Sequence, residues 1–422
     1  MNKIHRKYDV VVIGGGLAGL TAALSAKTHG NTVLIITKGF GSYYYGPGVI
    51  DLLGSRQGRA IKDPWLWMDK LPLNHPYQIL GETRIGEAMK YFSRQLEDCS
   101  LSFLTYRNGG NFLIPTALGM VRPTYLAPLS LAQGDIRQGE QIKIFGVEGF
   151  SNFSPQLVAT NILKEYRRLG IKGKADWGKL KLEKTYSRVI SAYDLALVLD
   201  NPDQVEDIIK QLLSQLDKEE KIGFPAILGL SNHRQVLAQI EEGTGRKVFE
   251  IPTIPPSVPG IRFHHCLSML LCKKGIEYIT GFPVLDAVIK GDEIKSVRVA
   301  TPGKTTSIQG KKIILATGGL ASDGLVSGPG WVREPLFNLP LYYRENVETW
   351  SRSSFWADQP YACFGIRVDE NMYPVDEKGR PIFANLCAAG SILASFDGIG
   401  EKSTGGVDIA TGFTAGREWG EG

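Results

Sequence analysis

The most constraining feature of the sequence is a glycine turn between an apolar strand and a helix close to the N-terminus. The run YDVVVIGGGLAGLTAALSAKTHG contains Gly14, Gly16 and Gly19 in the pattern G-x-G-x-x-G, directly after the strand. The three glycines permit a tight turn, the approach of a pyrophosphate to the backbone, and close packing of helix on strand. The first helical residues, Leu17 and Ala18, present free N–H groups to a phosphate. The pattern therefore predicts a nucleotide-binding unit.

The strand that completes this unit lacks the acid expected at its end. In such units the second strand is commonly followed by Asp or Glu, which binds a ribose. Here the strand TVLIIT ends in Thr37 and is followed by Lys38. The Thr37 hydroxyl can hydrogen-bond a ribose, and Lys38 can pair with a phosphate. The missing acid argues against a simple NAD site and still permits another nucleotide.

Length and charge limit the classes of protein to consider. A chain of 422 residues is too long for a single core of ordinary size, so we expect two domains. The 48 basic and 43 acidic residues give a net charge of +5 and are spread along the chain, which argues against nucleic acid as the main partner.

The cysteines and the apolar segments indicate where the chain works. The five cysteines include no C-x-x-C pair, which is typical of free thiols in a reducing compartment and gives no sign of a metal or iron–sulfur site. The start, MNKIHRKYDV, leads straight into the first strand, so we expect no signal peptide. No apolar stretch approaches the ~20 residues that span a bilayer. We expect a cytoplasmic chain that reaches a membrane only through partners or surface contacts.

Hydrophobic periodicity predicts strands at both ends of the chain and helices in its middle. We expect a helix at 83–99 and short strands near 101–105 and 111–115. The segment 155–250 is expected to be helix-rich because four of its stretches carry apolar residues at helical spacing. These stretches are PQLVATNILKEYRRLG, SAYDLALVLD, DQVEDIIKQLLSQLDKE and NHRQVLAQIEEG. Strands return from about residue 276.

Two glycine-rich elements in the last third of the chain resemble elements of flavoproteins with the two-dinucleotide-binding fold. The strand KKIIL is followed by Ala-Thr-Gly-Gly, which contains Thr317 and Gly318. The stretch NLCAAGSILASFDGIGEKSTGGVDIATGFTAGREW is similar to their closing element, in which a strand ends near Gly390 and a turn containing Gly405 and Gly406 leads into a helix that approaches the flavin. The resemblance implies an α/β fold with a Rossmann-like flavin domain.

The order of these elements predicts a flavin domain interrupted by an inserted cap. We expect residues 1–105 to form its first part, 106–275 to form a cap or substrate domain, and 276–422 to complete the flavin domain.

The sequence ITKG resembles the corresponding strand end in the group that contains succinate dehydrogenase, fumarate reductase and aspartate oxidase, where Ser or Thr followed by Lys is frequent. The following segment, GSYYYGPGVIDLLG, occupies the place where that group sets small residues and N–H groups against the flavin ring. The resemblance implies cofactor contacts from Gly39, Ser42, Gly46 and Gly48. The segment contains no histidine, so we expect the flavin to be bound without a covalent bond.

A narrower resemblance covers most of the chain. NFLIPTALGMVRPTYLAP, IFGVEGFSNFSP and FEIPTIPPSVPGIR resemble recurring segments of the B subunit of anaerobic glycerol-3-phosphate dehydrogenase. This resemblance implies oxidation of sn-glycerol 3-phosphate to dihydroxyacetone phosphate, with electrons passed to a quinone. It also implies an FMN cofactor, an FAD-containing catalytic partner and an iron–sulfur partner subunit, and a peripheral position on the inner face of the cell membrane through those partners. The dinucleotide motif itself favours FAD, which has a pyrophosphate, so both flavins stay open.

Oxidising a secondary alcohol requires a base for the hydroxyl proton and cations for the substrate phosphate. Arg122, Arg262 and Thr124 are candidates for binding the phosphate, and His264 and His265 are candidates for the base. Each has a structural alternative, because the arginines can pair with carboxylates at the domain junction and the histidines can lie on a helix surface.

Three functions are compatible with the sequence. The first is a flavin subunit that oxidises glycerol 3-phosphate directly. The second is an electron-relay or assembly subunit whose flavin is reduced by a catalytic partner. The third is a dicarboxylate oxidoreductase of the fumarate reductase type.

Overall fold

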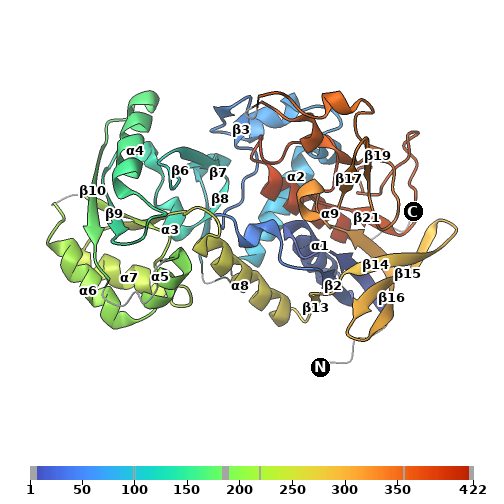
Figure 1. Ribbon diagram of the computed structural model, residues 1–422, viewed down its shortest axis with the longest axis horizontal. Coiled ribbons are helices and arrows are strands. Elements are labelled where there is room, and N and C mark those ends of the chain that lie inside the picture. Colours follow the sequence, from blue (N-terminus) through green and yellow to red (C-terminus); the bar gives the residue numbers. More distant parts are fainter. Residues whose placement is uncertain are drawn as a thin grey trace.

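The computed structural model describes residues 7–97, 99, 101–182, 190–217, 220–354 and 357–417 and is organised in two lobes (Figure 1). The first and last parts of the chain share the larger lobe, and the middle of the chain forms the smaller one. This arrangement is the one expected for a domain interrupted by an insertion, and the predicted α/β fold with a Rossmann-like strand–turn–helix unit is observed. The predicted boundaries of the domains themselves stay a prediction.

The larger lobe is built on a seven-stranded sheet in the order β13-β2-β1-β16-β15-β14, with β21 paired to β16. The pairs β13–β2, β2–β1, β1–β16 and β16–β21 are parallel, whereas β14, β15 and β16 form an antiparallel meander. The strands are β1 Lys7–Ile13, β2 Val33–Thr37, β13 Glu277–Thr280, β14 Val284–Lys290, β15 Glu293–Thr301, β16 Lys304–Leu315 and β21 Leu386–Ala388.

The central strands are apolar because both faces of the sheet are covered. All five residues of β2 are buried, a pattern typical of parallel strands that lie between two layers. The helices α1 (Leu17–Thr28) and α9 (Thr404–Gly416) pack closely against each other, with α2 (Pro76–Gln95) beside α9. A Cβ atom on Gly412 of α9 would lie 2.3 Å from the carbonyl oxygen of Ala18, so only glycine allows this approach. Small residues in both helices thus set the distance between them.

The smaller lobe, which we call the cap, contains the four predicted helices and also a parallel sheet that the sequence did not predict. Its strand order is β10-β9-β11-β12. The strands are β9 Gln141–Val147, β10 Lys174–Leu180, β11 Lys221–Pro225 and β12 Val248–Ile251, and the helices are α4 Pro155–Leu169, α5 Ala192–Val198, α6 Pro202–Leu213 and α7 His233–Thr244. Strands of four or five residues, such as β12 and β11, are too short for periodicity to separate them from the helices on either side.

Shorter elements make up the rest of the named helices and strands. The predicted strands near 101–105 and 111–115 are confirmed as β5 and β6, whereas the predicted helix at 83–99 begins earlier, as α2. The remaining elements are β3 Ser55–Arg56, β4 Arg59–Ala60, β5 Phe103–Thr105, β6 Phe112–Pro115, β7 Val121–Thr124, β8 Leu126–Pro128, α3 Leu129–Ala132, β17 Val326–Gly328, β18 Trp331–Arg333, β19 Leu341–Tyr342 and β20 Gly365–Ile366.

Helix α8 (Val258–Lys273) belongs to both hydrophobic cores. Its first turn contributes Val258 and Ile261 to the core of the cap. Its later turns contribute Phe263 and Leu267 to the core of the larger lobe. The helix therefore joins the two lobes through one continuous backbone.

A disulfide bond contradicts part of the prediction that all the cysteines are free thiols. Cys99 and Cys266 are bonded, with their Cα atoms 5.7 Å apart. Cys272, Cys363 and Cys387 are free. The pairing could not be recognised from spacing, because 167 residues separate the two cysteines and only the packing of α8 brings them together.

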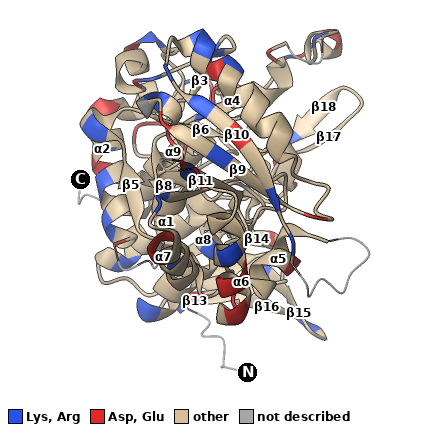
Figure 2. Cartoon of the chain, turned by 90° about the vertical axis from the view of Figure 1, so that its left-hand side faces the viewer, with Lys and Arg blue, Asp and Glu red and all other residues tan. Residues whose placement is uncertain are grey.

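Lys and Arg side chains and Asp and Glu side chains are interspersed over the face of the cap (Figure 2).

Within the described ranges, no helix combines the length and the apolar character needed to cross a membrane. In the same ranges, no group of three or more His, Cys, Asp or Glu side chains is arranged to hold a metal ion.

Candidate functional site

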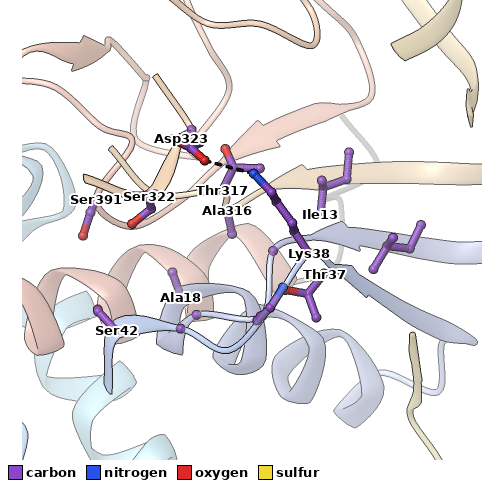
Figure 3. A pocket seen from close by; sticks show the side chains of 18 of the residues that line it. Ile13, Ala18, Thr37, Lys38, Ser42, Ala316, Thr317, Ser322, Asp323 and Ser391 are labelled. Carbon is purple, nitrogen blue, oxygen red and sulfur yellow. Dashed lines mark hydrogen bonds and ion pairs between the residues drawn. The ribbon is translucent and has the colours of Figure 1, made fainter. Parts of the chain in front are cut away.

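A cavity of about 790 Å³ opens at the carboxyl ends of β1, β2 and β16 (Figure 3). This end of an open parallel sheet is where α/β proteins bind their ligands. The predicted cofactor-binding residues that line it are Gly14, Gly16, Leu17, Ala18, Thr37, Lys38, Gly39, Ser42, Thr317 and Gly318. Residues from both ends of the chain therefore meet in one site.

The glycine turn has the geometry that its sequence predicted. Gly14 has a φ of +123°, and a Cβ atom there would lie 2.1 Å from the carbonyl oxygen of Ala316. By contrast, a Cβ atom on Gly16 would meet no atom within 4 Å, so the space above this residue is open. Gly16 is also the N-cap of α1 and provides no side-chain cap. The cavity thus offers an uncapped helix N-terminus to a phosphate, with room for the phosphate to approach.

Among the buried hydroxyl groups that have no hydrogen-bond partner in the part of the chain that the structure describes, two lie at the cavity or against its glycine turn. They are Thr317 Oγ1 and Tyr278 OH. Thr317 lines the cavity, and the Tyr278 hydroxyl lies against Gly15 of the glycine turn. Buried polar groups are usually satisfied, so an unpaired hydroxyl in a cavity wall indicates a polar ligand. Together with the open space at the helix N-terminus, this donor set fits a flavin nucleotide.

The remaining predicted cofactor residues do not line the cavity. Gly19 lies beneath the glycine turn, where a Cβ atom would be 2.2 Å from the carbonyl oxygen of Gly14. The others are Gly46, Gly48, Gly390, Gly405 and Gly406. Gly48 packs on Pro259 and Gly406 on the Tyr77 hydroxyl, so both accommodate neighbouring elements. Contact of these glycines with a cofactor stays a prediction.

Sequence reasoning missed several polar residues of the cavity wall, among them Asp323, Ser391 and Asp408. Asp408 lies on α9, is buried, and has Ser391 Oγ 3.5 Å from its Oδ1 atom. Burial raises the pKa of the Asp408 carboxyl to about 7. The cavity therefore contains a carboxyl group that exchanges its proton near neutral pH. No sequence motif marks it, because it faces the cavity only through the packing of α9 on α1.

The end of β2 is arranged differently from the expected ribose and phosphate contacts. The Thr37 hydroxyl donates a hydrogen bond to the carbonyl oxygen of Gly39 at 2.6 Å. The Lys38 ammonium forms an ion pair of 2.9 Å with Asp323, which reaches it from the segment after β16. Figure 3 shows this pair within the cavity.

His264 belongs to an aromatic cluster beside the cavity, whereas His265 is exposed. The Nδ1 atom of His264 lies 2.8 Å from the Tyr43 hydroxyl. Its ring also contacts the rings of Phe40 and Tyr44, and Phe40 lines the cavity. Burial, followed by the nearby charge of His265, lowers the pKa of His264. The structure thus brings one of the two predicted histidines to the edge of the site, in a form that is neutral at pH 7.

Arg122 and Thr124 come together on a single carboxylate. Both side chains, carried by β7, donate hydrogen bonds to Asp51. The Nε atom of Arg122 is buried without a partner in the described structure. Lys402, which precedes α9, has a pKa lowered by burial and by the charge of Arg122. Two cations therefore share one carboxylate in a cluster that does not line the cavity.

Arg262 occupies a structural position, which corrects its prediction as a phosphate ligand. Its guanidinium is buried and forms hydrogen bonds of 2.7 and 3.1 Å with Glu250 and one of 2.8 Å with the carbonyl oxygen of Gly229. Although burial alone would raise the pKa of Glu250, the charges of Arg262 and His233 lower it. Burial lowers the pKa of His233 itself to about 4. The expected alternative, pairing with a carboxylate, is therefore the one observed.

Comparison with known proteins identifies the family. The model of the FAD binding domain family matches residues 9–407. The B subunit of anaerobic glycerol-3-phosphate dehydrogenase from Pectobacterium carotovorum subsp. carotovorum is 31% identical over 96% of this chain and 96% of its own length. The protein of the same name from Pasteurella multocida is 28% identical over 98% of this chain and 99% of its own length.

Among solved structures, 3-ketosteroid delta1-dehydrogenase from Sterolibacterium denitrificans covers 98% of the chain with 11% identity and a TM-score of 0.45. A likeness at this level carries no argument about activity. The matches in sequence, in contrast, extend over nearly the full length of both partners. The chain therefore belongs to the family of anaerobic glycerol-3-phosphate dehydrogenase B subunits, within the flavin-dependent oxidoreductases that have an FAD binding domain.

Proposed function

We propose that this chain binds FAD non-covalently in the described cavity and takes part in the oxidation of sn-glycerol 3-phosphate to dihydroxyacetone phosphate. The observation that carries the proposal is a flavin-type cavity with an uncapped helix N-terminus in a chain whose full-length relatives are B subunits of this dehydrogenase. We infer the substrate from the names of the relatives and the position of the cofactor from the cavity.

The shape of the cavity favours FAD over FMN. Its wall continues from the glycine turn past the end of β2 to the segment Phe282–Leu285. An FMN phosphate would occupy only the helix N-terminus, whereas the pyrophosphate and adenosine of FAD would use the whole length. The described residues that line the cavity include no histidine, which supports binding without a covalent bond.

A phosphate subsite is proposed at Arg122 and Lys402. When bound, a flavin accepts the hydride removed from the alcohol carbon. The chain must then hold the substrate phosphate, and two cations that share the single carboxylate of Asp51 provide the charge for it. Asp408, which lines the cavity, lies near the start of α9, and Lys402 lies just before that helix. The subsite would therefore lie just beyond the cavity wall.

His264 is the better candidate for the base. Its lowered pKa keeps the imidazole neutral at physiological pH, so it can accept the proton of the alcohol. The hydrogen bond to Tyr43 fixes the orientation of the ring. His265 is exposed and has no contact with the cavity wall among the described residues, so we do not assign it this role.

We infer that the chain works with partner subunits, because its relatives are named as one subunit of a larger dehydrogenase. An FAD-containing catalytic subunit and an iron–sulfur subunit that lead electrons to a quinone would place the complex on the cytoplasmic face of the membrane. A relay function is the second candidate, because the cluster of Arg122 and Lys402 does not open into the cavity. In that case the flavin of this chain would be reduced by the partner.

An anaerobic titration of the purified flavin-loaded chain tests the proposal. Glycerol 3-phosphate is added alone and then with the partner subunits, and the flavin absorbance is followed. Bleaching by the substrate alone supports direct oxidation, and bleaching that requires the partner supports the relay function. Reoxidation of the reduced flavin by fumarate, without any response to glycerol 3-phosphate, would contradict both in favour of a dicarboxylate enzyme.

A further inference from the structure

The binding unit needs an acceptor for a ribose that β2 itself does not provide. The strand ends in Thr37 and Lys38, where related units place an acid. The Thr37 hydroxyl is already engaged, because it donates to the carbonyl oxygen of Gly39 and accepts from the Gly39 N–H at 3.3 Å. Lys38 is a cation and cannot accept a hydrogen bond. The side chains of Thr37 and Lys38 therefore offer no unengaged acceptor for sugar hydroxyls.

A carboxylate from a distant part of the chain occupies this position. Asp323 follows the short helical turn Leu320–Ser322 after β16 and has a left-handed conformation with a φ of +59°. Its Oδ2 atom lies 2.9 Å from the Lys38 ammonium, and both residues line the cavity (Figure 3). Both side chains are more than 70% exposed, at 71% for Lys38 and 73% for Asp323. Because exposed ion pairs contribute little to stability, this one is not required to hold the fold together.

The sheet order places the pair between two parts of the cavity. The glycine turn follows β1, Lys38 follows β2, and the segment Phe282–Leu285 follows β13, which pairs with the far side of β2. Hydrogen bonds from Gly281 and Phe282 to the carbonyl oxygen of Thr37 hold that segment against the end of β2. Neighbouring strands are about 4.8 Å apart, so the three positions cover roughly 10 Å. An adenosine diphosphate group that spans these three positions would place its pyrophosphate at the helix N-terminus and its ribose at the ion pair. Its adenine ring would then lie against the apolar segment Phe282–Leu285.

We propose that Asp323 supplies the ribose-binding carboxylate that β2 lacks, and that Lys38 is a positioning residue that holds it over the cavity. The carboxylate accepts hydrogen bonds from the 2′- and 3′-hydroxyl groups of the adenosine of FAD, as the acid at the strand end does in related units. One Asp323 oxygen pairs with Lys38, and the carboxylate retains further lone pairs for the hydroxyls. The inference rests on the FAD assignment under the proposed function and does not depend on which substrate is oxidised.

Binding of ligands to the flavin-free protein tests this role without any turnover. The affinities of FAD, FMN and ADP are measured by calorimetry for the natural chain, Asp323→Ala and Lys38→Met. Asp323→Ala is expected to weaken the binding of FAD and of ADP by about 10-fold or more, which is the range for the loss of hydrogen bonds to a charged group. The affinity for FMN should stay unchanged. Lys38→Met is expected to weaken FAD and ADP by about 3-fold, because the carboxylate remains but is no longer held in place. Glu293→Ala, which removes the carboxylate of a surface pair with Lys295, is the matched control and should change none of the affinities.

A second probe addresses the sugar hydroxyls directly. The natural chain should bind 2′,3′-dideoxy-ADP more weakly than ADP, and Asp323→Ala should bind the two equally. Discrimination that persists in Asp323→Ala would overturn the proposal, because another group would then recognise the hydroxyls. Tighter binding of FAD to Asp323→Ala would also overturn it, since the ion pair would then be a barrier to entry. Equal losses for FAD and FMN, or failure of the natural chain to bind ADP, would contradict a site for adenosine, whereas failure of the substrate titration would leave these binding results standing.

Discussion

Buried ionisable side chains lie in two different kinds of environment in this protein. In the cap, Arg262, Glu250 and His233 form a network in which the guanidinium and the carboxylate satisfy each other. In the flavin-type cavity, Asp408 is buried with Ser391 Oγ 3.5 Å from its Oδ1 atom, and burial raises its pKa to about 7. Satisfied charges of the first kind specify packing, whereas a proton held by Asp408 can respond to pH or to a bound cofactor.

Asp408 makes the stability of the flavin-free protein depend on pH. Because the carboxyl binds its proton more tightly in the folded chain than in the unfolded chain, the free energy of unfolding should fall as pH rises from about 4 to about 7. The Asp408→Asn variant lacks this contribution. Its melting temperature should therefore rise relative to that of the natural chain as pH increases. Thermal unfolding of both proteins at about pH 5 and pH 7.5 measures the difference. A difference that is the same at both values would contradict the assigned pKa.

Arg122 carries the proposed phosphate subsite. Arg122→Ala is expected to raise KM for glycerol 3-phosphate by about 10-fold or more with a smaller change in kcat, because a charged contact to the phosphate is lost. Arg122→Lys keeps the charge next to Asp51 and should restore part of the affinity. Arg298→Ala, which breaks an exposed pair with Asp286, is the control. The measurement is the steady-state kinetics of the assembled complex with each variant. An unchanged KM in Arg122→Ala would rule out the subsite.

At the scale of elements, the unit β1–turn–α1 and helix α9 place the cavity. Gly412 lets α9 lie against the backbone of α1, whereas Gly16 leaves space for a ligand. The two glycines therefore serve opposite purposes, since the space beside one is filled by protein and the space beside the other is open. Helix α8 adds the link to the cap, since Arg262 ties it to β12 through Glu250.

Valine substitutions should separate these two roles of glycine. Gly412→Val forces α1 and α9 apart and should destabilise the protein by about 1–3 kcal/mol or more, as overpacking does. At Gly16 an added Cβ atom meets no atom within 4 Å, so the melting temperature of flavin-free Gly16→Val should stay near that of the natural chain, while flavin affinity falls. Thermal unfolding and flavin titration are the measurements. Full flavin affinity in Gly16→Val would mean that the phosphate does not lie at this turn.

The ion pair of α8 should be necessary for stability and irrelevant to the cofactor. Arg262→Met leaves the buried carboxylate of Glu250 without its cation and should cost about 3–5 kcal/mol in the free energy of unfolding. Adding Glu250→Gln should recover part of this loss, because the uncompensated charge is removed. Denaturant unfolding measures both, and flavin affinity is measured in parallel. A loss of flavin affinity without a loss of stability would make Arg262 a ligand candidate again.

At the scale of the whole molecule, the features that could be predicted from the sequence are those that depend on residues close together in the chain. The glycine turn, β2 and the four cap helices follow from local patterns of small, apolar and polar residues, and all of them are observed. The cap sheet was missed because its strands alternate with helices and two of them, β11 and β12, have only five and four residues. The ion pair between Lys38 and Asp323 was missed because 285 residues separate its members. The disulfide bond and the cavity position of Asp408 likewise arise only when α8 and α9 pack.

The most direct measurement is the identity and amount of flavin released by acid or heat from the purified chain, which is offered an equal mixture of FAD and FMN where it is purified without flavin. We expect FAD at close to one per chain, released without proteolysis, as the proposed non-covalent binding requires. FMN in place of FAD would contradict the use of the whole cavity from the glycine turn to Leu285. A chain that retains no flavin and binds none on reconstitution would contradict the central claim that this cavity is a flavin site.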